Sequence, residues 1–494
     1  MGKRIVIAAD WGASGGKMAK GSFDGERVQV DDFYDFPNQP MELNQNLYWD
    51  LFSLYNHILE GMIYYGRNHE VASVGIDAWG ASYGLLDKRG RLLEPVYHYR
   101  DMRTEKSMER MFQKISKRSL FQLTGCQPNR TYTLPQLYSY VEHGDRIIEL
   151  ADKMLFLPDL IEYFLTGTAT TERSIAGTSG MMKPGQDGWE YKVMDALGIP
   201  TNMLTDIVDA GTIRGYLTDN VSNRTGIGKT KVVATVGHDT ATAVAGIPDF
   251  GMNQVYISIG TNINMGIELG RSVIGERAFK GGFKNAGVLE ERKIVYRDFS
   301  ACWLLNELIR TCSDEGITYT HRDIMDMVQR CESKRVYIDV EEEALNNAGG
   351  SIKQKINNYL AQTCQEQLDS NADFARCIME SIALKIKFCT EYLKNELHIP
   401  VKKVSVVNGA TRNYVLMQII SEALGERIFC GMPYATLMGN VLVQFYALGE
   451  ISSVDEIRQV AGRSFKMKEY IPKQGTAARW NEDLQNMLKK GVMH

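Results

Sequence analysis

The order of apolar and polar positions in the first 30 residues predicts short strands joined by tight turns. Residues 5–9 form an apolar run that ends at Asp10, and a second apolar run over 18–23 follows a glycine-rich segment. The pair Asp24-Gly25 then marks a further turn. Short apolar runs bounded by glycine and aspartate are typical of buried strands and tight turns. The N-terminus is therefore predicted to fold as strand, turn, strand, turn, strand.

The same order of elements recurs near the middle of the chain. Residues 255–259 are an apolar run, residues 260–262 read Gly-Thr-Asn, and a second apolar run covers 263–267. The preceding segment 245–251 contains glycine and proline and is predicted to be a domain hinge. The recurrence predicts two related halves facing a cleft. The predicted domains cover residues 1–247 and 248–494.

Run length and periodicity predict further elements. Buried strands are predicted over 71–76, 232–236 and 404–407. Helices are predicted over 371–397, over 414–424 with Gly425 as the closing residue, over the charged stretch 104–117, and in the charged tail from about residue 452.

Length, charge and cysteine spacing limit the class of protein. The chain has 494 residues with 44% hydrophobic content, enough for more than one core. Its net charge of −4 predicts no nucleic-acid partner, and no apolar run approaches the roughly 18 residues of a membrane span. The eight cysteines form no C-x-x-C pair, which favours reduced thiols over a zinc cluster, and the first apolar run is too short for a signal peptide. We expect a soluble, cytoplasmic protein.

The segment from Asp10 to Lys17 is the first candidate site. Its glycines let backbone N–H groups point at one anion, and Lys17 adds a positive charge for a phosphate. Asp10, at a strand end, is placed to hold Mg²⁺ through water. The residues alone leave open an ordinary hairpin with a polar tip.

Two further candidates follow predicted strands. Asp239, between His238 and Thr240, stands where an α/β sheet holds ligands and is placed to accept a hydroxyl proton. Gly260-Thr261 can bind a phosphate oxygen through its backbone and hydroxyl. A helix-capping aspartate and a plain turn are the alternatives that stay open.

Two more candidates suit flat ligands. Gly409 and Ala410 lie between a strand and a helix and leave room for an adenosine against the backbone. Trp79 beside Gly80 is suited to pack on a sugar face. A plain strand-to-helix turn and a core tryptophan remain the alternatives.

The order of these segments resembles that of the FGGY carbohydrate kinases. The matching pieces are DWGASGGK, GIDAWGASYGLLD, YRDMRT, LFLPDLIEYFLTG, VGHDTATAV, SIGTN and the region around NGATRN. The likeness covers roughly residues 4 to 450 and looks closest to the members that act on L-rhamnulose. It implies an α/β fold of two actin-like (ribonuclease H-like) domains around a central cleft. It also implies an enzyme that uses ATP and Mg²⁺ to phosphorylate a small ketose, with L-rhamnulose and its first-carbon hydroxyl as the predicted acceptor.

The resemblance implies a role for each matched residue. Asp239 matches the general base, and Asp10 matches the acidic residue near the metal. The substrate-binding residues are predicted to be Trp79, Gly80, His238, Thr240 and Asp298. The nucleotide-binding residues are predicted to be Ala13, Ser14, Gly15, Gly16, Lys17, Thr261, Asn306, Gly409 and Ala410.

Three departures from the family pattern keep other functions open. Ser82 replaces an aspartate, Asp298 replaces an asparagine, and Asn408 replaces a glycine. L-fuculose, xylulose or another ketose or polyol therefore remain alternative substrates. A catalytically weak sugar or nucleotide sensor and an actin-like ATPase are the alternatives from other classes, and a homodimer is left open as the assembly.

Overall fold

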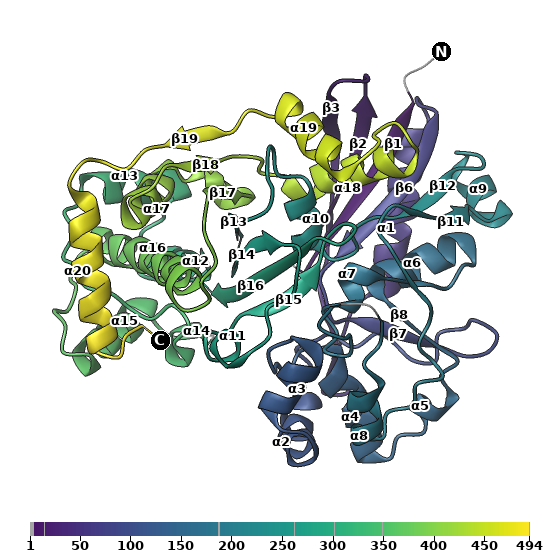
Figure 1. The fold of residues 1–494 in the computed structure, drawn as a ribbon, viewed down its shortest axis with the longest axis horizontal. Coiled ribbons are helices and arrows are strands. Elements are labelled where there is room, and N and C mark those ends of the chain that lie inside the picture. Colours follow the sequence, from purple (N-terminus) through teal and green to yellow (C-terminus); the bar gives the residue numbers. More distant parts are fainter. Residues whose placement is uncertain are drawn as a thin grey trace. The chain divides into compact units, whose positions relative to one another are not determined.

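The computed structural model describes residues 4–13, 15–185, 188–260, 262–300, 302–347 and 349–493. The chain forms two compact units (Figure 1). The first comprises Met1–Phe250, Glu268–Val295 and Tyr434–Lys466, and the second comprises Gly251–Ile267, Tyr296–Pro433 and Met467–His494. The chain first leaves the first unit after Phe250, within the predicted hinge, but returns to it twice. The predicted domain boundary after residue 247 stays a prediction, because each compact unit is made of several separate segments and does not correspond to a single division of the chain.

A six-stranded sheet forms the centre of the first unit. Its strands are β1 (Ile5–Gly12), β2 (Gly15–Phe23), β3 (Val28–Pro37), β6 (Val71–Ala78), β11 (Thr212–Tyr216) and β12 (Lys231–Ala234), in the order β11-β12-β6-β1-β2-β3. Strands β1, β6 and β12 are parallel neighbours, whereas β2 is antiparallel to β1. Parallel strands are covered on both faces, which explains their unbroken apolar runs. The predicted N-terminal strands and the strands over 71–76 and 232–236 are confirmed.

The sheet of the second unit repeats this arrangement. Its seven strands are β13 (Gln254–Ile259), β14 (Asn262–Leu269), β15 (Lys284–Gly287), β16 (Lys293–Ser300), β17 (Lys403–Val407), β18 (Ile428–Cys430) and β19 (Lys468–Tyr470). Six of them, in the order β19-β18-β17-β13-β14-β16, correspond to the six strands of the first sheet, and β15 is added beyond β16. The pairing directions agree as well, because β13, β17 and β18 are parallel neighbours, while β14 is antiparallel to β13 and β19 is antiparallel to β18. The predicted internal repeat and the two-domain α/β class are confirmed.

Helices cover both faces of the first sheet. Alternate residues of β1, including Ile7 and Trp11, share a core with α1 (Leu51–Gly66) and α6 (Leu157–Thr166). Helices α10 (Asp239–Ala245) and α18 (Ala435–Ala447) pack against β1 and β6, as Figure 1 shows for α18. The other elements of this unit are β4 (Met41–Leu43), β5 (Asn46–Tyr48), β7 (Tyr83–Leu86), α4 (Thr133–His143), α5 (Ile147–Leu150), β8 (Lys153–Phe156), β9 (Thr171–Glu172), α7 (Arg173–Ala176), α8 (Tyr191–Leu197), β10 (Ile207–Val208), α9 (Asp219–Thr225) and α11 (Glu276–Lys280).

The helix predicted over 104–117 is confirmed as α2 (Thr104–Lys114), which ends three residues earlier than predicted. Ile115 has extended backbone angles that end α2. The next helix, α3 (Lys117–Thr124), begins after Ser116, whose hydroxyl accepts a hydrogen bond from Ser119 N. The predicted end was too late because this serine N-cap starts a new helix within the charged stretch.

In the second unit, the long helix α16 (Asn371–Asn395) packs on α17 (Tyr414–Leu424). Gly425 ends α17 in the left-handed conformation at φ 68°, as predicted. The tail contains the predicted helices α19 (Val454–Ser464), in the first unit, and α20 (Thr476–Lys489), but the sequence did not reveal strand β19 between them. The remaining elements are α12 (Cys302–Asp314), α13 (His321–Arg330), α14 (Glu343–Asn346), α15 (Ile352–Gln362) and the 3₁₀ helix η1 (Gly409–Arg412).

All eight cysteines are free thiols. Among the helices of the described residues, none combines the length and the apolar content needed to cross a membrane.

Candidate active site

Three aspartates gather where neighbouring parallel strands of the first sheet end. Asp10 on β1 and Asp77 on β6 are direct register partners. Asp239 follows β12 as the first residue of α10, and the segment before it continues alongside β6, because Ala78 N donates to Gly237 O at 2.9 Å. The carboxyl ends of parallel strands meet at one edge of a sheet, so the three carboxyl groups share that edge.

Burial governs the ionisation of the Asp10 and Asp77 pair. The pKa of Asp10 is raised to about 7, first by burial and then by the negative charge of Asp239, while a hydrogen-bond interaction with Asp77 and the charge of Lys17 oppose the rise. Burial, followed by the charge of Asp10, raises the pKa of Asp77 well above its ordinary value, and Asn440 opposes this as a hydrogen-bond donor. Burial and mutual repulsion thus favour the neutral form of this pair, and a cation bound at the same edge would favour its charged form.

This donor set fits a magnesium ion held mainly by water and phosphate. Carboxylate oxygens are the ligands that Mg²⁺ prefers, and it is commonly bound through one or two of them. Within the described residues, no group of three or more His, Cys, Asp or Glu side chains is arranged to hold a metal ion by itself. Asp10 would supply the protein oxygen, and the ion would neutralise charge on the transferred group.

Close packing requires glycine at two positions of the first predicted loop, Gly12 and Gly16. Gly12 and Gly15 pair at the end of the β1–β2 hairpin, and a Cβ on Gly12 would lie 2.7 Å from Gly15 O. A Cβ on Gly16 would lie 2.1 Å from the ring of Phe36. Ala13 is half-buried beside this pair, and the predicted Ser14 lies outside the described residues.

Lys17 is held by its own hairpin. Its ammonium group forms an ion pair with Asp35 and lies 5.5 Å from the ring of Phe33 and 5.3 Å from that of Tyr434. Its charge nevertheless reaches Asp10. A phosphate at this position would compete with Asp35 for Lys17.

Asp239 is held by contacts that the sequence did not reveal. Thr240 N donates to Asp239 Oδ1 at 2.5 Å, and His238 Nε2 lies 3.6 Å from the same oxygen. The preceding turn is bound to a buried glutamate, since Gly237 N donates to Glu172 Oε2 at 2.9 Å. Glu172 also caps α7, and that local N-cap pattern is the one signal the sequence carries for it.

Trp79 stands in a buried aromatic cluster. Its ring centroid lies 4.2 Å from that of Trp49 and 6.5 Å from that of Trp11. The indole N–H groups of Trp79 and Trp49 each donate to Ser82 Oγ at 3.0 Å. Ser82, where the family has an aspartate, is buried and serves as the common acceptor for two indoles. Any influence of Ser82 on a bound sugar would therefore be indirect, through its hydrogen bond to Trp79.

The backbone after Trp79 is strained and strongly held. A Cβ on Gly80 would lie 2.7 Å from the Thr178 side chain. Ala81 has φ +71°, a conformation that costs a non-glycine residue about 1–3 kcal/mol. Ala81 N donates to Thr178 Oγ1 at 3.0 Å, and Ala81 O accepts from Thr133 Oγ1 at 2.9 Å and from Gln136 Nε2 at 3.1 Å. Three hydrogen bonds thus fix the turn that carries the predicted sugar-binding residues.

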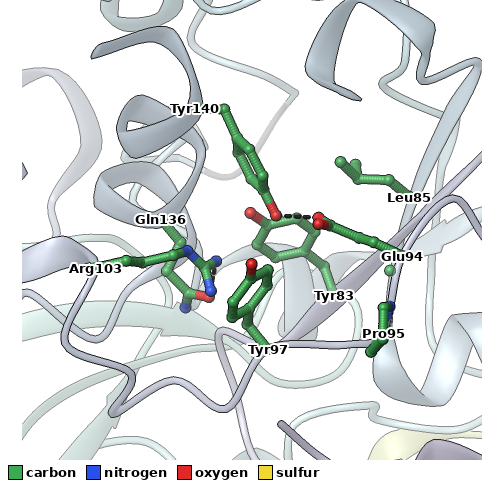
Figure 2. A pocket seen from close by; sticks show the side chains of 9 residues that line it. Tyr83, Leu85, Glu94, Pro95, Tyr97, Arg103, Gln136 and Tyr140 are labelled. Carbon is green, nitrogen blue, oxygen red and sulfur yellow. Dashed lines mark hydrogen bonds between the residues drawn. The ribbon is translucent and has the colours of Figure 1, made fainter. Parts of the chain in front are cut away.

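The YRDMRT segment is anchored by a buried polar cluster. Figure 2 shows Arg103 pointing toward Tyr97 and Gln136, with Tyr140 bonded to Glu94 nearby. The Arg103 guanidinium lies 3.5 Å from the centre of the Tyr97 ring, and its Nη2 donates to Gln136 Oε1 at 3.3 Å.

This anchor places Tyr99 near the catalytic candidate. Burial raises the pKa of Tyr99, Arg100 opposes the rise, and the charge of Asp239 adds to it. Tyr99 therefore lies within electrostatic range of Asp239. No sequence pattern assigns Tyr99, one of 24 tyrosines, to the site.

His98 in the same segment makes stability depend on pH. Burial, and then the charge of Arg100, lowers the pKa of His98 from 6.5 to about 4. Between these values only the unfolded chain binds the proton, so stability present above pH 6.5 is lost as the pH falls toward 4. The lost free energy of unfolding is on the order of 2–3 kcal/mol.

The variant His98→Gln lacks this titrating group, so its free energy of unfolding should fall less than that of the parent protein between pH 7 and pH 4. The difference in free energy of unfolding between the two proteins, measured by urea denaturation, should therefore become smaller as the pH falls. The exposed His143→Gln should leave that difference constant, and equal behaviour of the two variants would contradict the assignment.

The remaining predicted residues belong to the second unit. Asn408 has φ +72° and ψ −170°, backbone angles that are essentially confined to glycine, and its Nδ2 donates to Ser258 Oγ at 2.8 Å. The asparagine therefore stands in a strained conformation where the family has a glycine, and this side-chain hydrogen bond helps to hold it. A Cβ on Gly409 would meet no atom within 4 Å, so the space beside Gly409 and Ala410 in η1 is open.

Asp298 and Asn306 are both exposed in this unit. Asp298 accepts a hydrogen bond from Asn264 Nδ2, and Asn264 Oδ1 accepts from Tyr256 Oη at 2.6 Å. Asn306 lies on α12. The predicted Thr261 lies outside the described residues.

Comparison with known proteins identifies relatives along almost the whole chain. The family model for the N-terminal domain of the FGGY family of carbohydrate kinases matches residues 5–246, and that for the C-terminal domain matches residues 255–448. A rhamnulokinase from Bacteroides thetaiotaomicron is 32% identical over 95% of this chain and 96% of its own length. A rhamnulokinase from Oceanobacillus iheyensis is 28% identical over 94% and 97%. In fold, the chain is similar to the ligand-bound xylulose kinase from Lactobacillus acidophilus, with a TM-score of 0.82 at 15% identity over 98% and 97% of the two chains.

Proposed function

Because the chain belongs to the FGGY family of carbohydrate kinases, we propose that it transfers the γ-phosphoryl group of ATP to the first-carbon hydroxyl of L-rhamnulose. The observation that carries this proposal is the gathering of Asp10, Asp77 and Asp239 at one sheet edge. The rhamnulokinase relatives support the choice of sugar.

Asp239 is the proposed general base. Its carboxylate would accept the proton of the sugar hydroxyl as that oxygen attacks the γ-phosphorus. Its position at the first turn of α10 keeps it in a fixed direction, and Glu172 holds the turn before it. Phosphoryl transfer depends mainly on positioning and charge neutralisation, and this rigidity serves both.

The proposed sugar contacts of the first unit lie around Asp239. Trp79 would offer its indole to an apolar sugar face, and Gly80 would leave room beside it. The further proposed sugar contacts are His238, Thr240 and Asp298.

The nucleotide and the metal are assigned by the family resemblance. Asp10 would hold Mg²⁺, and the open space at Gly409 supports an adenosine there. The further proposed nucleotide contacts are Ala13, Ser14, Gly15, Gly16, Lys17, Thr261, Asn306 and Ala410.

An ADP-release assay with Mg-ATP and a sugar panel tests the proposal. The panel is L-rhamnulose, L-fuculose, D-xylulose, L-xylulose, L-ribulose, glycerol and a blank without sugar. We expect L-rhamnulose to give the highest kcat/KM, with mass spectrometry of the product locating the phosphate. A higher value for another sugar would overturn the substrate and direct attention to Ser82 and Asp298. ADP release that does not depend on sugar would favour an ATPase, and nucleotide binding without turnover would favour a sensor.

A further inference from the structure

We propose that Asn440, on helix α18, is a positioning residue for the Asp10 and Asp77 carboxyl pair. The proposal rests on the proposed function, because it concerns the efficiency of the same phosphoryl transfer. Asn440 is 430 residues away from Asp10 in the chain and belongs to a segment in which the sequence shows no motif.

The orientation of the Asn440 side chain follows from its contacts. Its Nδ2 donates to Asp77 Oδ2 at 2.7 Å and to Gly75 O at 3.2 Å. Its Oδ1 accepts from Gln444 Nε2 at 2.7 Å. Asn440, Gln444 and Asp77 are fully buried. Because Gln444 occupies the oxygen side, the amide N–H groups must face Asp77.

Gln444 connects this amide to both strands that carry the carboxyl groups. Its Nε2 also donates to Ile7 O on β1 at 3.0 Å, and its Oε1 accepts from Ser73 Oγ on β6 at 2.7 Å. Side-chain hydrogen bonds thus fix the position of helix α18 relative to β1 and β6. The side-chain polar groups of Asn440, Gln444 and Ser73 all have partners, and such a buried network fixes one geometry more firmly than apolar packing does.

The same helix also fixes the element that begins with Asp239. A Cβ on Gly439 would lie 1.9 Å from Thr242 O in α10, and a Cβ on Gly246 would lie 2.7 Å from Gly439 N. Two glycines therefore let α10 and α18 touch backbone to backbone. Helix α18 contacts the carboxyl pair through Asn440 and the helix of the base through Gly439.

The proposed consequence concerns the direction of the Asp10 carboxyl group. Asn440 fixes one oxygen of Asp77, and Asp77 stands beside Asp10 as its register partner on the neighbouring parallel strand. Without the amide donor, Asp77 is free to turn and no longer holds Asp10 in one orientation. The sugar-binding residues around Trp79 contact neither Asn440 nor Gln444 in the hydrogen bonds of the described residues, so sugar affinity should be independent of the change.

The test compares Asn440→Leu with Ser73→Ala. Both remove hydrogen bonds from the same buried network, but Ser73 lies at its far end from the carboxyl pair. In the leucine variant we expect kcat to fall about 10²-fold, as for a misplacement of about 1 Å, with the sugar KM unchanged. The Mg²⁺ concentration for half-maximal activity should rise, and sugar affinity measured without nucleotide should stay at the parent value. Ser73→Ala should retain the parent kcat.

Each outcome has a defined meaning. An unchanged kcat in Asn440→Leu, or equal losses in both variants, would overturn the positioning role. If the leucine variant does not fold, Asn440→Ser removes the amide with less disturbance and is expected to show the same selective loss of kcat. Failure of the parent protein to phosphorylate any sugar would instead count against the proposed function.

Discussion

Replacing Asp239 by asparagine is expected to lower turnover by a factor of roughly 10² to 10⁴ while sugar binding survives. The amide has nearly the same shape, and its oxygen still accepts the hydrogen bond from Thr240 N. It cannot take the proton of the attacking hydroxyl. Only a step that needs a base is therefore affected, whereas contacts to the bound sugar persist.

The measurement separates catalysis from binding. Steady-state kinetics with Mg-ATP gives kcat, and titration calorimetry with the sugar gives its affinity. Asp219→Asn is the matched control, because Asp219 is likewise the first residue of a seven-residue helix but is exposed. Turnover equal to that of the parent protein would show that Asp239 is not the base.

Much of the fold was predictable because its strands are short, apolar and bounded by glycine or aspartate. Parallel strands buried on both faces produce unbroken apolar runs, and the duplicated sheet produces the same run twice. The strand β19 was missed because its three residues, Lys468–Tyr470, are mostly exposed and lack an apolar pattern. These residues form a strand because they pair with β18, which is distant in the sequence.

The candidate site was predictable only where residues lie next to each other in sequence. His238, Asp239 and Thr240 are consecutive, and Asp10 follows a recognisable strand. Glu172 and Asn440 act by contact with distant segments, and no local pattern shows such contacts.

The contacts of Ser82 were likewise not predictable from the sequence. Sequence comparison can identify the departure, but the hydrogen bonds of Ser82 to two indoles appear only when Trp49 and Trp79 are brought together.

Replacing Arg214 by leucine is expected to destabilise the first unit by about 3–5 kcal/mol. Arg214 on β11 is buried and forms ion pairs with Asp159, and with Glu162 at 2.5 Å. Its Nη1 also donates to Thr170 O at 2.5 Å. Removing the guanidinium leaves two buried carboxyl groups without their cation, which costs more than the ion pairs themselves contribute.

The pH dependence of this loss gives the sharper test. Burial raises the pKa of Asp159 to about 7 and that of Glu162 to about 8 even though Arg214 opposes the rise. Without Arg214 both pKa values rise further, so the folded state must hold protons that the unfolded chain releases above about pH 4. The destabilisation should therefore be larger at pH 8 than at pH 5.

Urea denaturation followed by tryptophan fluorescence measures both effects. The signal reports mainly on the first unit, which contains Trp11, Trp49, Trp79 and Trp189. Arg224→Leu is the control, because Arg224 forms an exposed hydrogen bond with Asn56 and should cost less than about 0.5 kcal/mol. A similar small cost for Arg214→Leu at both pH values would mean that Asp159 and Glu162 do not depend on it. The presence of Asp159 and Glu162 in the segment LFLPDLIEYFLTG would then need an explanation other than the ion pair with Arg214. A large, pH-dependent cost would instead identify them as the buried support of Glu172, since Asp159 Oδ1 accepts a hydrogen bond from Glu172 N at 3.0 Å.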